Sequence, residues 1–131
     1  MNDIRKLIRI QIGVLLLFIV FKIVRSKILS SENNFIQVIG LSLPNLFEGI
    51  LGVLILTALG LTLTRNKNIK HNYIYILAII FAAIYVITQE FKIHNLGGKN
   101  VYDSNDVLFS LIGLFIGTII VFIIKPKIET T

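Results

Sequence analysis

Four long apolar runs are the feature of this chain that most limits what it can fold into. A run of about 18 residues with few charges is long enough to cross a bilayer core of about 30 Å as an α-helix. The runs 72–89 and 107–124 contain no Asp, Glu, Lys or Arg. The chain has only 131 residues, of which 55% are hydrophobic, and a soluble domain of this size could not bury so much apolar surface. The pattern predicts one all-α unit, an integral membrane protein built as a bundle of four transmembrane helices.

The expected helices span about 8–24, 45–64, 72–90 and 106–125. The second is expected to begin beside Pro44, because the first turn of a helix tolerates proline, whose missing amide hydrogen would have no partner there. The connection before it, 26–43, either lies in the head-group interface or continues this helix outward. The first run is the shortest, since only twelve residues separate Arg9 from Lys22. It spans a bilayer if these two long side chains extend outward to the interface.

Two other readings of the first run remain open. It fits an interfacial amphipathic helix because of its length, and it fits a cleaved signal peptide because basic residues precede an apolar core. The chain stays basic over 22–27 and lacks the small residues of a cleavage site, which argues against the signal peptide. We therefore expect the first helix to stay in the mature protein.

The basic residues in the connections predict the orientation, because Lys and Arg near the ends of spans stay on the cytoplasmic side. One side holds eight of them: Arg5, Lys6, Arg9, Arg65, Lys67, Lys70, Lys125 and Lys127. The other side holds five, namely Lys22, Arg25, Lys27, Lys92 and Lys99, together with five of the seven acidic residues. The eight-residue side is expected to be cytoplasmic, with both termini on it, in a bacterial inner membrane. Anionic lipid head groups account for the net charge of +6 without a nucleic acid partner.

The sequence offers little for metal or cofactor chemistry. It has no cysteine, and its two histidines, His71 and His94, lie at opposite ends of the third expected helix. His94 near Glu90 and Asp103 makes only a weak metal hypothesis, so no metal and no cofactor is predicted. No nucleophile paired with a base, phosphate-binding loop or dinucleotide fingerprint is present, and no catalytic residue is assigned.

Acidic and polar residues are predicted to gather at the outer end of the bundle. Glu48 opens the second helix, Gln89 and Glu90 end the third, and Asp103 and Asp106 open the fourth. Antiparallel helices bring all of these to the same side, where carboxylates packed between helices are costly and therefore indicate function. In the alternative reading, Asp103 caps the last helix and Asp106 fills a capping-box position.

Small residues form stripes along three of the expected helices. Asp106, Ser110, Gly113 and Gly117 lie on one face of the fourth, and the two glycines form a GxxxG pair that allows close helix approach. The third has a stripe of equal spacing at Ala78, Ala82, Tyr85 and Gln89, while Gly52 lies on the second. We expect the third and fourth helices to pack on their matching stripes.

The segment 90–117 resembles the C-terminal signature of VanZ-like membrane proteins. The matching positions are Glu90, Gly98, Lys99, Asp103, Asp106, Ser110, Gly113 and Gly117. Lys99 stands where the family has arginine, and Ser110 where it has asparagine. The resemblance implies a four-helix membrane protein associated with glycopeptide (teicoplanin) resistance and the cell envelope.

Two functions follow as hypotheses. In the first, Glu48, Glu90, Lys99, Asp103, Asp106 and Ser110 form an outward-facing site for a lipid-linked or peptidoglycan-related group. In the second, the chain is a non-catalytic accessory subunit or homo-oligomer whose small-residue stripes bind partner helices. A small multidrug exporter fits the size, but the spans lack the mid-membrane carboxylate that proton coupling requires.

Overall fold

The computed structural model describes residues 3–90 and 104–128. Over these residues the chain forms four α-helices and no strand: α1 (Asp3–Leu29), α2 (Asn34–Leu63), α3 (His71–Glu90) and α4 (Ser104–Ile124). Each helix is long and apolar enough to cross a membrane. The predicted all-α class with four candidate spans is confirmed, and by length and composition these are the helices of a multi-pass membrane protein.

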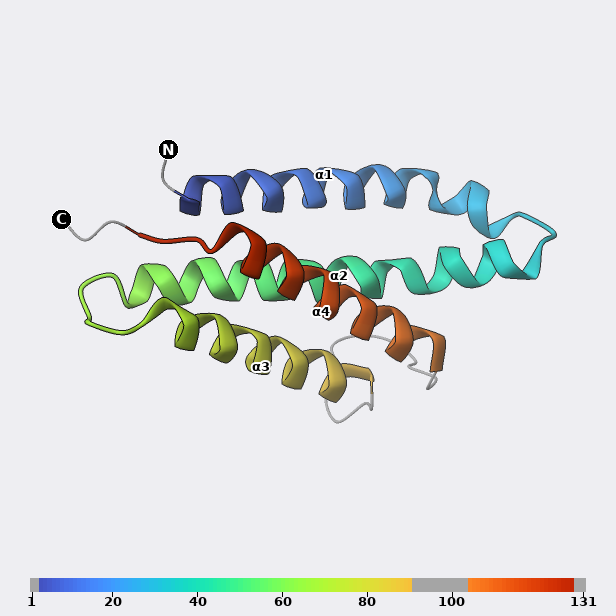
Figure 1. Cartoon of the computed structure of the whole chain (residues 1–131). Helices are drawn as coiled ribbons and strands as arrows, with labels where there is room; N and C mark the ends of the chain where they lie inside the picture. Colours follow the sequence, from blue (N-terminus) through green and yellow to red (C-terminus); the bar gives the residue numbers. More distant parts are fainter. Residues whose placement is uncertain (1–2, 91–103, 129–131) are drawn as a thin grey trace.

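Consecutive helices run antiparallel, so α2 and α4 run in the same direction, and α2 is the central helix (Figure 1). It contacts all three of the others, most extensively α4, whereas α1 has few contacts with α4. Figure 1 shows the N-terminus, the α2–α3 connection and the C-terminal segment at one end of the molecule. We call this the basic end, because it carries all the basic residues that were assigned to the inner side. The core is built around Val53, Leu54 and Leu61 of α2.

The first two helices are longer than expected. At 1.5 Å per residue, α1 and α2 extend over about 40 and 45 Å, against about 30 Å for α3 and α4. The start of α2 near residue 45 is therefore wrong, since the helix begins at Asn34. Asn33 caps it by accepting a hydrogen bond from the Phe35 amide at 2.9 Å. The α1–α2 hairpin thus extends beyond the ends of α3 and α4 (Figure 1).

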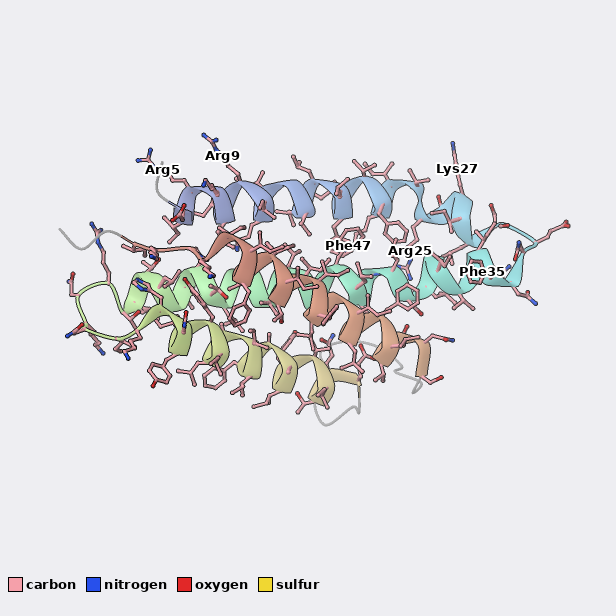
Figure 2. All side chains as sticks on the ribbon, in the orientation of Figure 1. Arg5, Arg9, Arg25, Lys27, Phe35 and Phe47 are labelled. Atoms are coloured by element: carbon pink, nitrogen blue, oxygen red, sulfur yellow. The ribbon has the colours of Figure 1, made fainter. Side chains whose placement is uncertain are left out.

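Pro44 lies inside α2, and not in its first turn as expected. Proline has no amide hydrogen, so the Gly40 carbonyl loses the donor that the residue four positions later normally supplies. Arg25 of α1 donates from Nε to this carbonyl at 3.1 Å. Figure 2 shows Arg25 between α1 and α2, whereas Lys27 points away from the bundle. A side chain of a neighbouring helix therefore allows α2 to continue through its proline.

Aromatic residues attach α1 to α2 near the middle of the two helices. Phe47 of α2 lies 5.2 Å from Phe18 and 6.1 Å from Phe21, measured between ring centroids (Figure 2). Elsewhere α1 presents much exposed apolar surface, including Leu17 and Ile23. Such a surface is compatible with lipid tails, because lipid offers an apolar solvent.

The segment after α4 folds against α3. Lys125 takes a left-handed conformation with φ of 46°, which redirects the chain. The hydroxyl of Tyr75 donates to the Pro126 carbonyl at 2.5 Å, and the Tyr75 ring packs edge-on against Phe122 of α4. Both Tyr75 and Pro126 are buried. This contact fixes the position of the described C-terminal segment at the basic end.

Candidate functional site

The candidate site lies where α2, α3 and α4 meet, at the end of α3 and α4 opposite the basic end. Its first pair joins α2 and α4: the Ser42 hydroxyl donates to Asp106 Oδ1 at 2.8 Å. Ser42 is completely buried, so its hydroxyl needs a partner within the protein. Asp106 lies in the first turn of α4, where the helix dipole favours an acid, and it also binds a neighbouring helix.

A second pair joins α3 and α4 one helical turn further along. Ser110 donates from Oγ to Glu90 Oε1 at 3.5 Å, and Ser110 is only 2% exposed. The distance between Ser110 Oγ and Glu90 Oε1 is long for a hydrogen bond between oxygens, so this contact is weak and is consistent with a position at the edge of the site. Because Ser110 follows Asp106 by four residues, both lie on the same face of α4.

A third pair joins α2 and α3. Glu48 is half-buried and accepts a hydrogen bond from the side chain of Gln89. Lys22 of α1 lies close enough to interact with the Glu48 charge, and its ammonium group lies 4.9 Å from the centroid of the Phe18 ring. The carboxylates of Glu48, Glu90 and Asp106 thus come from three different helices. We refer to these three residues as the carboxylate cluster.

Close backbone contact between α2 and α4 brings these pairs together. A Cβ atom added to Gly49 would lie 2.7 Å from the Ser110 carbonyl oxygen, and one added to Gly113 would overlap the Leu46 carbonyl. One added to Gly117 would lie 3.0 Å from the Val53 Cβ. Only glycine leaves room for this approach of the two helices.

The expectation that the stripes of α3 and α4 face each other is wrong for the glycines. Gly113 and Gly117 face α2. The surface of α2 that they face also contains a glycine, Gly49, so the two helices can approach closely. On α3, Ala78 and Ala82 are buried, and Ala82 lies opposite Gly52 of α2. Helices α3 and α4 do touch, but each packs mainly on α2.

The structure brings together four of the six predicted ligand-binding residues: Glu48, Glu90, Asp106 and Ser110. Lys99 and Asp103 lie outside the described residues, as does His94. Within residues 3–90 and 104–128, no three His, Asp or Glu side chains are placed to hold a metal ion.

Sequence reasoning missed Ser42, Lys22 and Arg25. Ser42 precedes Gly49 by seven residues and so continues its face of α2 upstream. That signal was hidden because the second helix was expected to start after Pro44. The roles of the two cations depend on which side of α1 faces α2, and the weak amphipathicity of this apolar helix does not indicate that side.

Chemically, the cluster is an acceptor site. A carboxylate has about four lone-pair positions and can accept hydrogen bonds from several donors at once. Such a group suits an ammonium or another hydrogen-bond donor of a ligand. The chain has no match among models of protein families, curated proteins or solved structures.

Proposed function

We propose that this chain is a multi-pass protein of a bacterial inner membrane, and that its carboxylate cluster binds a cationic or hydrogen-bond-donating group of an envelope molecule. The ligand class is a lipid-linked or peptidoglycan-related head group. The observation that carries the proposal is that the buried hydroxyls of Ser42 and Ser110 donate to Asp106 of α4 and Glu90 of α3, while Glu48 of α2 lies beside Gln89, the residue before Glu90. Carboxylates are rarely placed between apolar helices without a functional reason.

The charges of the described residues support an outward-facing cluster. Eight basic residues occupy the basic end, and Asp3, which lies 3.4 Å from Lys6, is the described acid there. The opposite end carries the carboxylate cluster and Glu32, together with Lys22, Arg25 and Lys27. By the positive-inside rule the basic end is cytoplasmic, and the cluster faces the envelope.

The resemblance to VanZ-like proteins gives the proposal its biological setting, because Glu90, Asp106 and Ser110 are among the matching positions. The same resemblance assigns Asp103 and Lys99 to the site, and both lie outside the described residues. Ligand binding is the role proposed for all of these residues.

The test replaces Glu48→Gln together with Asp106→Asn. Both amides keep the size of the side chain and an acceptor oxygen for the Gln89 or Ser42 contact, so the fold is retained while the charge is lost. The matched control is Glu32→Gln, an exposed residue at the tip of the α1–α2 hairpin. We expect the double variant to lose teicoplanin resistance in a bacterial strain that depends on this chain, and the control to keep it.

Membrane insertion and expression are verified by immunoblot of the membrane fraction. A wild-type resistance and envelope phenotype in a fully inserted double variant would reject the proposal.

A second candidate function is an accessory subunit of a larger membrane complex. It is favoured by an apolar cavity of about 370 Å³ between α2 and α3, lined by Gly52, Phe81, Ala82 and Tyr85 among others. Ala82 is buried between α2 and α3, whereas Phe81 and Tyr85 are exposed, so these two aromatic side chains are the ones that a partner helix would contact. Purification in mild detergent tests this candidate: stable co-isolation with a larger membrane protein supports it, and an isolated monomer contradicts it.

A further inference from the structure

A polar cavity lies at the basic end, far along the helices from the carboxylate cluster. It encloses about 400 Å³ between the end of α2, the start of α3 and the C-terminal segment. The α2–α3 connection forms one wall, and Ile128 of the C-terminal segment contributes another. The Tyr75 contact with Pro126 holds that segment in place.

The lining of this cavity combines positive charge with neutral hydrogen-bond donors. Arg65, Lys67 and His71 are at its surface, and Asn66 and Asn68 add two side-chain amides. Among the described residues that line it, none is Asp or Glu. Asp3, the described acid at this end, is paired with Lys6. The cavity is therefore suited to an anion.

Arginine, lysine and amide groups together match the oxygens of a phosphate. The guanidinium group presents a planar set of donors that binds phosphate through two parallel hydrogen bonds, and lysine adds a point charge. His71 is the first residue of α3, so the positive end of that helix lies at the cavity.

The cavity also has an apolar floor. Leu61, Ile74 and Ile128 line it below the polar residues, next to the apolar part of the bundle. A cavity that is polar at its mouth and apolar beneath matches a group attached to a hydrocarbon chain. Basic pockets at the cytoplasmic ends of transmembrane helices bind anionic lipid head groups in this way.

We propose that this cavity is a binding site for a phosphate group, which an anionic phospholipid head group or free phosphate supplies. Arg65 and Lys67 bind the phosphate oxygens, and the side chains of Asn66 and Asn68 complete the shell. The site is independent of the proposed envelope ligand, because it lies at the other end of the helices.

The test compares two double variants of the purified full chain with equal loss of charge. Arg65→Gln with Lys67→Gln removes the charges of the cavity, whereas Arg5→Gln with Arg9→Gln removes two at the same end that point away from the bundle (Figure 2). Each protein is placed in nanodiscs of phosphatidylcholine with or without phosphatidylglycerol, and co-purifying lipid is counted by native mass spectrometry. A separate arm titrates inorganic phosphate and follows thermal unfolding.

We expect the wild type and the Arg5, Arg9 variant to retain phosphatidylglycerol, and the Arg65, Lys67 variant to retain it at least about tenfold less well. Stabilisation of the wild type by millimolar inorganic phosphate, lost in the Arg65, Lys67 variant, would instead assign free phosphate as the source. Equal retention by both double variants would overturn the proposal. The absence of any response of the wild type to either probe would overturn it as well.

Discussion

At the scale of single residues, the two most informative contacts both satisfy a buried carbonyl. Arg25 donates to the Gly40 carbonyl that Pro44 leaves without its helical partner, and Tyr75 donates to the Pro126 carbonyl. An unpaired buried carbonyl costs more than an average hydrogen bond gains, because it loses its hydration without replacement. The loss of either donor is therefore expected to lower the free energy of unfolding.

The Arg25 contact predicts a coupling with Pro44. Arg25→Met removes the donor and keeps much of the side-chain length, and it should lower the free energy of unfolding by about 1–3 kcal/mol. In a Pro44→Ala background the residue at 44 supplies its own amide to Gly40, so the same substitution should cost less. Chemical unfolding of the four proteins in detergent micelles gives the coupling energy. A cost of Arg25→Met that is the same in both backgrounds would show that the two residues act independently.

The Tyr75 contact predicts a clear difference between two tyrosines of α3. Tyr75→Phe leaves the buried Pro126 carbonyl without its donor and should destabilise the protein by about 1–2 kcal/mol. Tyr73 is 60% exposed, so Tyr73→Phe serves as the control and should have little effect. Unfolding midpoints in detergent measure both. Equal midpoints for the two variants would contradict the role given to the C-terminal segment.

At the scale of helices, the approach of α4 to α2 determines the shape of the candidate site. The backbone of Gly113 faces that of Leu46, and Gly49 faces Ser110 one turn away. This packing places Asp106 beside Ser42. Because lipid provides no hydrophobic force between helices, close packing and interhelical hydrogen bonds are what hold α2 and α4 together.

The chain provides a matched pair of glycines with which to test this packing. Gly113→Ala places a Cβ atom against the α2 backbone and should destabilise the protein by about 1–3 kcal/mol, as overpacking does. Gly13 of α1 has nothing within 4 Å of its added Cβ, so Gly13→Ala should be neutral or slightly stabilising, since alanine favours helix over glycine. Thermal unfolding in detergent compares the two. A stable Gly113→Ala variant would mean that α2 and α4 lie further apart.

The presence of the four helices could be predicted from the sequence, whereas it could not be predicted which helices pack against each other. Apolar runs of span length identify α3 and α4 to within two residues, since length and the absence of charge are local properties. The sequence does not decide whether α2 extends back to Asn34, because Pro44 normally breaks a helix and its rescue by Arg25 is a long-range contact. The choice of α2 as the partner of the α4 glycines likewise depends on tertiary packing, because α2 also has a small-residue face.

The candidate site, like the fold, could be predicted from the sequence only in part. The positions of Glu48, Glu90, Asp106 and Ser110 near one end follow from antiparallel topology alone. Their individual partners, Ser42 above all, depend on helix rotation, which an apolar sequence specifies weakly.

At the scale of the whole molecule, the described charges divide the chain into two chemically different ends. One end has eight basic residues and a cavity of about 400 Å³ lined in part by Arg65 and Lys67, and the other has carboxylates on three helices. We propose that the four spans place the first end in the cytoplasm and the second at the envelope face.

The most direct test uses the absence of cysteine, because any single introduced thiol is a unique label site. Glu32→Cys and Ser104→Cys mark the ends of the α1–α2 hairpin and of α4, whereas Lys67→Cys and Lys127→Cys mark the basic end; all four residues are exposed. A membrane-impermeant maleimide added to intact spheroplasts should label Glu32→Cys and Ser104→Cys at once. It should label Lys67→Cys and Lys127→Cys only after the membrane is permeabilised. The reverse pattern, or labelling of Glu32→Cys and Lys67→Cys from the same side, would contradict the account.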